Sequence, residues 1–254
     1  MNKTTEKNTY TVLFAVGMVI IVGVILAGLF GGLRSQITEN QRKEKQQNIL
    51  FAMGINQSYL SDRKEDAINF VPPTEAEKLY KEFIKKEYVL QDGKMTESNE
   101  AFDIDVAREQ KKAAADEDYK QKLPLYVGEY KGEEYYIVPV YGKGLWDAIW
   151  GYIALEEDLK TVKGVYFDHK GETPGLGANI TQAYFQEDFT GEEIFDGDKF
   201  TGIEVAKGNN DPTNQRKNDH RVDAIAGATI TGNGVTAMIK NDLKNYLPYF
   251  DKIK

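Results

Sequence analysis

The sequence predicts an α+β protein: a single membrane-spanning helix near the N-terminus, then a polar domain with a mainly antiparallel sheet and flanking helices. Three observations lead to this fold class. Residues 12–30 are drawn only from apolar side chains and glycine. Glycine-punctuated runs of β-branched and aromatic residues follow one another from residue 123 to residue 168. Beyond residue 123 these strands come in sequence and the helical spacing follows them, which is typical of an α+β fold rather than of alternating βαβ units.

The N-terminal apolar segment is long enough to cross a bilayer. No charged residue occurs between Lys7 and Arg34, and at about 1.5 Å per residue this stretch exceeds the roughly 30 Å hydrocarbon core. Backbone groups in lipid must bond internally, so the segment forms a helix. We expect a tail at residues 1–10 and a transmembrane helix at residues 11–33. A cleaved signal peptide is the alternative, but its apolar core of about 7–15 residues is shorter.

A stalk and a charged region are expected next. Residues 34–48 are almost wholly polar, so residues 34–55 are predicted as a stalk helix whose apolar end, residues 49–53, docks on the domain. We expect residues 56–122 to be a helical, charged region packed on that domain. Within it, a capping box at Thr74–Glu77 predicts a helix start, and residues 91–123 are interpreted as a surface helix or loop insertion.

Residues 123–254 are predicted to form the main domain. Their runs of Val, Ile, Tyr and Phe between glycines indicate strands, and their later apolar spacing indicates helices. The expected strands lie near 125–127, 134–140, 150–156, 162–168 and 201–206. The expected helices are 178–189 and a last helix from about Gly232 toward Pro248.

Composition excludes several classes of site. The chain has no cysteine and two histidines, which rules out disulfides, cysteine-ligated metal centres and a thiol nucleophile on this chain alone. A net charge of -8 argues against nucleic acid as a partner. The glycine motifs of nucleotide-binding folds and the GxSxG motif are absent from the sequence. No catalytic residue and no metal ligand is therefore assigned.

Three segments rich in glycine and small residues remain as candidate binding loops. Residues 141–151 contain both tryptophans and offer either a surface for a flat ring or a hairpin with aromatic core anchors. Residues 169–177 form a glycine loop before a predicted helix, either for an anionic or polar ligand or as a tight connection. Residues 223–235 surround Thr229 with small side chains just before the last helix. A phosphate on Thr229 would lie near the positive end of that helix, although the spacing alone also fits a simple turn.

In this order behind one apolar helix, the three segments resemble the C subunit of the sodium-translocating NADH:quinone oxidoreductases. Residues 223–229, DAIAGAT, are similar to that family's flavinylation motif D-x-x-S/T-G-A-T. In the family, FMN is joined to the final threonine by a phosphoester bond, so the resemblance implies covalent FMN on Thr229. Ala226 departs from the usual serine or threonine, which removes a hydroxyl group but keeps the small volume. The other matching positions are Asp223, Gly227 and Ala228.

The resemblance also implies a role. Residues 123–254 would be an FMN-binding domain of a subunit of NADH:ubiquinone reductase (Na(+)-transporting), within a six-subunit assembly. The chain would relay electrons from a membrane iron–sulfur centre toward the flavin of the B subunit and quinone. An external FAD-dependent flavin transferase would attach the cofactor. Further pocket contacts are implied for Leu145, Trp146, Glu172, Thr173, Leu176 and Lys207.

The side of the membrane and the type of protein each have an alternative interpretation. The resemblance implies the cell inner membrane, with the bulk of the chain on the periplasmic side. Lys3 and Lys7 before the helix are outnumbered by the basic residues after it, which leans toward a cytoplasmic domain, but the imbalance is small and we follow the resemblance. One alternative is the homologous G subunit of an Rnf-type ferredoxin:NAD oxidoreductase, which shares the threonine motif. Another is a non-redox membrane-anchored scaffold module, which the Ala226 departure favours.

Overall fold

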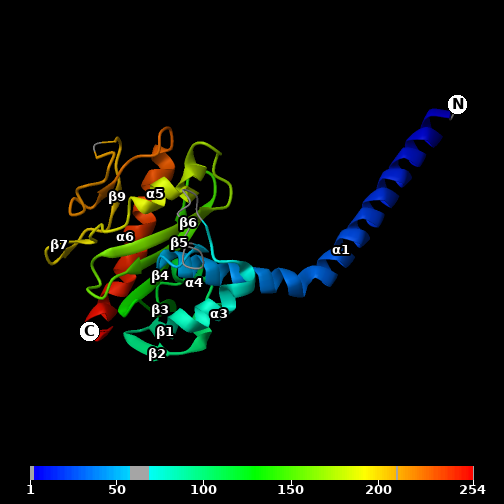
Figure 1. The fold of residues 1–254 in the computed structure, drawn as a ribbon. Coiled ribbons are helices and arrows are strands. Elements are labelled where there is room, and N and C mark those ends of the chain that lie inside the picture. The colour runs from blue at the N-terminus through cyan, green and yellow to red at the C-terminus, as the bar shows by residue number, and fades with distance from the viewer. Residues whose placement is uncertain (1–2, 58–68, 210, 254) are drawn as a thin grey trace. The chain divides into compact units, whose positions relative to one another are not determined.

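The chain has two compact units, with their boundary between Glu44 and Lys45. The computed structural model describes residues 3–57, 69–209 and 211–253 (Figure 1). Helix α1 (Lys3–Ala52) makes up the described part of the first unit and contributes its last two turns to the second. The sheet and all other described helices belong to the second unit.

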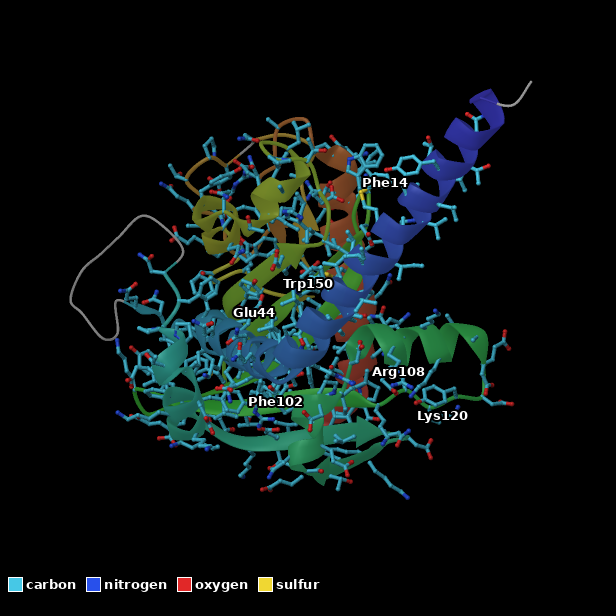
Figure 2. All side chains as sticks on the ribbon, turned by 90° about the vertical axis from the view of Figure 1, so that its right-hand side faces the viewer. Phe14, Glu44, Phe102, Arg108, Lys120 and Trp150 are labelled. Carbon is cyan, nitrogen blue, oxygen red and sulfur yellow. The ribbon has the colours of Figure 1, made fainter. Side chains whose placement is uncertain are left out.

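In the first unit, helix α1 exposes nearly all of its side chains from Asn8 onward. The large apolar residues between Tyr10 and Leu33 are exposed around the whole helix, and Figure 2 shows Phe14 projecting outward from it. Among the described residues, this is the one helix long and apolar enough to cross a membrane by length and composition. A helix that is apolar all round is typical of a membrane span.

In the second unit, the end of α1 is part of a core. Ile49, Leu50 and Met53 are fully buried, which confirms the apolar docking end predicted for the stalk. Lys45 donates a hydrogen bond to the carbonyl of Phe102, and its ammonium group lies 4.8 Å from the centre of that ring. This pair fastens the last turns of the helix to the domain.

The second unit is built on one antiparallel sheet. Its strands are β1 (Ile84–Gln91), β2 (Lys94–Glu97), β3 (Leu123–Tyr130), β4 (Glu133–Lys143), β5 (Ala148–Leu155) and β6 (Val162–His169). They pair in the order β2-β1-β3-β4-β5-β6. Two small pairs lie beside this sheet: antiparallel β7 (Phe195–Asp196) with β8 (Lys199–Phe200), and parallel β9 (Glu204–Val205) with β10 (Arg221–Val222). The predicted fold class is confirmed, and the four strands expected between residues 125 and 168 are present.

Strands β1 and β2 were not predicted. Ile84 continued the helical spacing of Leu79, Tyr80 and Phe83, but helix α3 (Pro73–Phe83) ends at Phe83 and Ile84 begins β1. The missed signal is Asp92-Gly93, whose two residues both have positive φ between the two strands. Asp-Gly is a favoured two-residue hairpin turn because it accepts this backbone conformation.

The helices before β3 also differ in detail from the expectation. Helix α3 starts at Pro73, with Pro72 as its N-cap and no capping hydrogen bond from a side chain. The predicted capping box at Thr74–Glu77 is therefore wrong: proline already fits the first helical position, where its missing N–H costs nothing. A short 3₁₀ helix, η1 (Asn99–Asp103), follows. Helix α4 (Val106–Ala115), capped by Asp105, confirms a helix in the charged stretch.

The later helices have other bounds than expected. The expected helix 178–189 is two short pieces, η2 (Gly177–Thr181) and α5 (Ala183–Glu187). Helix α6 (Thr229–Ile253) starts three residues earlier than expected and continues past Pro248. The threonine predicted to precede the last helix is thus its first residue.

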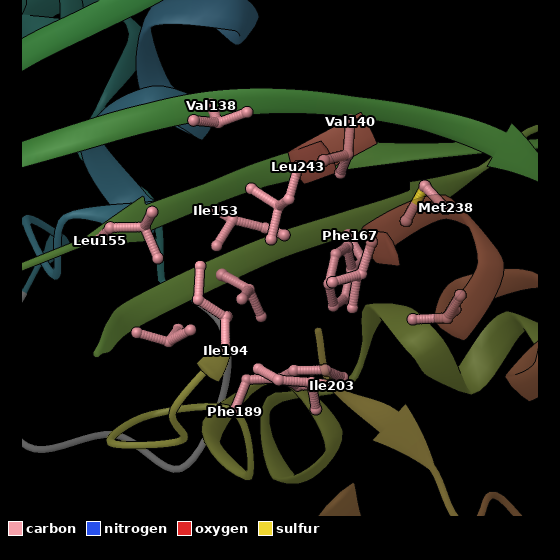
Figure 3. Packing of buried hydrophobic residues seen from close by; sticks show 14 of the residues in the cluster. Val138, Val140, Ile153, Leu155, Phe167, Phe189, Ile194, Ile203, Met238 and Leu243 are labelled. Atoms are coloured by element: carbon pink, nitrogen blue, oxygen red, sulfur yellow. The ribbon is translucent and has the colours of Figure 1, made fainter. Parts of the chain in front are cut away.

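Both faces of the sheet are buried because alternate residues point to opposite sides. On β4, Tyr136, Val138 and Val140 face the core under α6, whereas Tyr135 and Ile137 face the core that contains the end of α1 and helix α3. Figure 3 shows Met238 and Leu243 of α6 packed toward the strand residues on the first of these faces. The sheet thus fixes helix α6, whose first turn carries the third candidate segment.

Candidate functional site

The three candidate segments meet at the carboxyl group of Glu172. This residue lies in the loop after β6 and is 4% exposed. Its Oε1 accepts a 2.9 Å hydrogen bond from the backbone N–H of Trp146, in the turn between β4 and β5. Its Oε2 accepts a 2.7 Å hydrogen bond from the hydroxyl of Thr231, in the first turn of α6. The structure therefore joins the segments that sequence analysis singled out separately.

The indole ring of Trp146 is fixed by a hydrogen bond at its nitrogen, but most of the side chain is exposed. Its indole Nε1–H donates a 3.1 Å hydrogen bond to Thr173 Oγ1, while 66% of the residue remains exposed. Leu145 and Leu176 are also exposed large apolar side chains. A fixed, exposed aromatic ring beside aliphatic side chains is a suitable platform for a planar ligand.

Asp147 holds the turn that carries Trp146 in place. Asp147 accepts a hydrogen bond from the N–H of Ala148 and pairs with Lys170 at 3.1 Å. These contacts, the Ala148 bond first, lower the pKa of the Asp147 carboxyl group. The turn and the loop after β6 are therefore linked on the outside by this ion pair and on the inside by Glu172.

Thr229 is exposed at the N-terminal end of α6. In the part of the chain that the structure describes, its hydroxyl group has no hydrogen-bond partner. Gly227 has φ +72°, and a Cβ there would lie 2.7 Å from Cδ2 of Leu176. Ala228 is buried beneath the turn, and the following Ile230 is exposed. Leu145, Trp146, Leu176 and Ile230 are exposed apolar residues on the three segments that meet at Glu172, and together we call them the site patch.

Gly142 and Gly144 of the first segment, and Gly234 of the third, allow neighbouring parts of the chain to pack closely. A Cβ at Gly142 would lie 2.8 Å from Cβ of Met238, and one at Gly144 would lie 2.5 Å from Oε1 of Glu172. A Cβ at Gly234 would meet the carbonyl of Lys143. These glycines let α6 and the Glu172 loop approach the end of β4 closely, whereas the open surface is the ring of Trp146.

Asp223 and Lys207 belong to a second pair of loops, at the ends of parallel strands β10 and β9. Asp223 Oδ1 accepts a 3.4 Å hydrogen bond from the N–H of Asp211 and lines a small cavity of about 50 Å³. Lys207 is exposed. The two loops are joined by a hydrogen bond that the N–H of Ala206 donates to the carbonyl of Val222.

Asp242, in the middle of helix α6, holds that helix against the end of strand β4. Its two carboxyl oxygens accept hydrogen bonds from the N–H of Tyr141 at 2.6 Å and from Nε2 of Gln110 at 2.7 Å. Burial raises its pKa to about 7, although both hydrogen bonds act in the opposite direction. This contact ties the middle of α6 to β4 and α4.

Comparison with known families identifies the domain type. Residues 144–244 match the family described as FMN-binding domain. That range includes Trp146, the Glu172 loop and Thr229, so the convergent segments lie inside the matched region. The predicted cofactor class, FMN, is supported at this level.

Relatives match along nearly the whole chain. The C subunit of Na(+)-translocating NADH-quinone reductase from Yersinia pestis is 31% identical over 237 residues, covering 89% of this chain and 84% of the relative. The chain belongs to the family of C subunits of Na(+)-translocating NADH-quinone reductase. A further C subunit, from Pseudomonas aeruginosa, is 29% identical over 252 residues, covering 92% and 90% of the two chains. This family is the one predicted from the three motifs.

The fold agrees with a solved member of the same family. The crystal structure of the C subunit from Parabacteroides distasonis superposes with a TM-score of 0.70 at 33% identity. The match covers 86% of this chain and 96% of that one. Proteins of this family are, by name, subunits of an oxidoreductase complex.

The residues of the site patch fit a flavin. An isoalloxazine ring needs an apolar, flat contact surface, which Trp146 and its aliphatic neighbours offer. A phosphate group needs N–H donors, and the first backbone N–H groups of α6 point away from any intrahelical acceptor. The exposed hydroxyl of Thr229 stands at that helix end.

Sequence reasoning missed three residues of this site. Thr231 lies two positions after Thr229, and its Glu172 contact spans 59 residues of chain. Asp242 lies on a helix face that sequence analysis described only by its apolar residues. Ile230 completes the site patch. The only signal in the sequence was a polar residue, Asp242, between core positions Ile239 and Leu243 of the helix.

Proposed function

We propose that this chain is the electron-relay subunit of a sodium-pumping NADH:quinone oxidoreductase, with FMN joined through its phosphate to Thr229. The single observation that carries the proposal is the position of Thr229: exposed, first in helix α6, and beside the site patch within an FMN-binding domain. Bound FMN supplies reversible redox chemistry. The chain supplies attachment, orientation and a local environment.

Apart from Glu172, each predicted contact has a role in this proposal. Trp146, Leu145 and Leu176 hold the ring by their apolar surfaces, and Thr173 keeps the indole in place through its hydroxyl group. Gly227 and Ala228 keep bulk away from the attached phosphate, whose charge is favoured by the helix end. Lys207 and Asp223 lie on the adjoining loops, where the lysine adds a positive charge.

The attachment is a transfer reaction that needs a partner. The bond forms between Thr229 Oγ and the phosphorus of the FMN moiety of FAD. The diphosphate bond of FAD breaks, AMP leaves, and the threonine proton is lost. The FAD-dependent flavin transferase supplies this chemistry, so the chain needs no activating base of its own. Because Ala226 stands in place of the usual serine or threonine, attachment of flavin to this chain would show that the transferase does not require that hydroxyl group.

The relay role explains why no catalytic residue was assigned. We propose that the electron comes from a membrane iron–sulfur centre and passes toward the flavin of the B subunit and quinone, within a six-subunit complex. Electron transfer of this kind requires position and potential, not acid–base groups on the protein. Helix α1 anchors the chain in the inner membrane, with the domain on the periplasmic side. Protease added to intact spheroplasts should cut the domain, and complete protection would overturn this orientation.

Covalent fluorescence tests the proposal. The full chain is co-expressed with the flavin transferase and run on a denaturing gel. The band should fluoresce under ultraviolet light, and Thr229→Val should abolish this signal. Thr96→Val, an exposed threonine on strand β2, is the matched control and should fluoresce like the native chain. A dark native band would favour the scaffold alternative, and a fluorescent Thr229→Val band would disprove the attachment site.

A further inference from the structure

The contact between Glu172 and Thr231 stands out because it is buried, polar and long-range. Each oxygen of the carboxyl group already accepts one hydrogen bond, from Trp146 N–H and from Thr231 Oγ. The N–H of Glu172 donates to Nδ1 of His169 at 3.1 Å. With both oxygens engaged inside the protein, Glu172 holds protein groups in place.

The surroundings are shaped for this contact. A Cβ at Gly177 would lie 2.5 Å from the hydroxyl oxygen of Thr231, and one at Gly144 would lie equally close to Oε1 of Glu172. Neither glycine has a positive φ. They are therefore needed for space rather than for backbone conformation, because any larger residue would separate the two partners.

The contact links the ring platform to the attachment point. Trp146 is fixed at its backbone by Glu172 and at its indole by the adjacent Thr173. Thr231 lies in the same helical turn as Thr229. Holding the Thr231 side chain against Glu172 therefore fixes the rotation of the first turn of α6, and with it the direction of the Thr229 hydroxyl group.

We propose that Glu172 and Thr231 form a positioning pair that sets Thr229 against Trp146 for flavin attachment and for stacking of the attached ring. This inference rests on the proposed function and adds a role for a residue outside the flavinylation motif. Both are positioning residues, since they act through Trp146 and the first turn of α6.

Variants at Thr231 distinguish an effect on the positioning of Thr229 from a general loss of stability. With transferase limiting, Thr231→Val should lower the initial rate of covalent flavin attachment by about five- to tenfold, as expected for the loss of one buried hydrogen bond. Thr231→Ser keeps the hydroxyl group and should stay within about twofold of the native rate. Thr236→Val is the matched control: its hydroxyl group, also on α6, bonds the carbonyl of Gly232 and the N–H of Val205. It should lower the unfolding temperature without slowing attachment.

Variants at Glu172 test the other partner. Glu172→Gln can accept from Trp146 N–H with its amide oxygen and donate to Thr231 with its amide nitrogen, so it should attach flavin within about twofold of the native rate. Glu172→Met, of similar length but without polar atoms, should lose most of the rate. Equal rates in Glu172→Met and Glu172→Gln would overturn the pair, as would equal slowing by Thr231→Val and Thr236→Val.

A readout without flavin keeps this test separate from the proposed function. In full-length chain carrying Trp150→Phe, Trp146 is the only tryptophan left. Its near-ultraviolet circular dichroism should fall by about half or more in Glu172→Met, because the turn is released, and persist in Glu172→Gln. An unchanged signal in Glu172→Met overturns the pair. A native chain that never takes up flavin contradicts only the proposed function.

Discussion

Two regions of this molecule expose large apolar side chains, and they do so in different ways. Helix α1 exposes them all round between Tyr10 and Leu33. The site patch exposes four, and the adjoining Glu172, Thr173 and Thr231 hold its segments in place by hydrogen bonds. A continuous apolar surface is suited to lipid, whereas a small apolar patch with a fixed polar frame is suited to one oriented ligand.

Charge placed in helix α1 should have the largest effect. Ile20→Arg with Ile21→Arg puts two cations near the middle of the apolar stretch, at a cost of roughly 2.5–3.5 kcal/mol each. The chain should then move from carbonate-washed membranes to the soluble fraction or be degraded. Ser35→Arg with Gln36→Arg, beyond the apolar stretch, is the control and should stay with the membrane. Membrane retention of the Ile20/Ile21 variant would contradict a lipid-facing role.

Removal of the Trp146 ring tests the site patch. Trp146→Ala should leave attachment at Thr229 intact but release the flavin ring, with a loss of about 1 kcal/mol of contact. Flavin emission of the folded, loaded protein should rise several-fold because ring stacking no longer quenches it. Trp150→Phe, in strand β5, should leave emission unchanged. Equal emission of Trp146→Ala and native protein would remove Trp146 from the pocket.

The pH dependence of stability reports on the buried acids that support the sheet and α6. Burial raises the pKa of Asp242 to about 7 and that of Glu192 to about 8. An acid with a raised folded-state pKa retains its proton in the folded state at a pH where the unfolded chain has lost it. Its contribution to stability is therefore complete at low pH and is lost as the pH rises from about 4 toward the folded value.

The unfolding free energy of the chain should consequently fall between pH 5 and pH 8, by several kcal/mol, because each acid contributes about 1.4 kcal/mol for every pH unit over which only the unfolded chain has lost its proton. Urea titrations at three pH values measure this slope. Glu192→Gln should flatten it, while Glu193→Gln, at the neighbouring half-buried position, should not. A free energy that increases over this range would show that neither acid holds its proton in the folded protein.

Backbone strain at Gly227 should have the smallest effect. Gly227→Ala places a side chain at φ +72° against Leu176, at a cost of about 1–2 kcal/mol. The urea midpoint should decrease and flavin attachment should slow modestly. Gly208→Ala, where a Cβ would meet open space, is the control. A midpoint unchanged by Gly227→Ala would mean that the turn before Thr229 adapts freely.

The sequence predicted the parts of this fold that have strong local patterns. Strands β3 to β6 were found because their β-branched and aromatic runs are bounded by glycines, and helix α1 because its apolar run is uninterrupted. Strand β1 was missed because its charged, partly exposed residues carry little alternation and Ile84 fits the preceding helical spacing. Its conformation is decided by pairing with β2 across the Asp92-Gly93 turn and with β3.

The candidate site divides in the same way. Thr229 and Trp146 were found from motifs local in sequence. The partner of Glu172 was not, because η2, α5 and strands β7 to β10 lie between Glu172 and Thr231 along the chain. Gly142 and Gly144 were interpreted through the tryptophan beside them, but the space they leave is filled by α6 and Glu172. Tertiary contacts, not local patterns, assign such glycines.

Peptide mass spectrometry can assign covalent flavin to a single residue of the chain. The full chain, co-expressed with flavin transferase, is digested and the peptide that contains Thr229 is sequenced by fragmentation. We expect an added mass of FMN less one water, located on Thr229 rather than on Thr231 or the intervening Ile230. An unmodified Thr229 peptide from protein that retains flavin, or the same added mass on another residue, would contradict it.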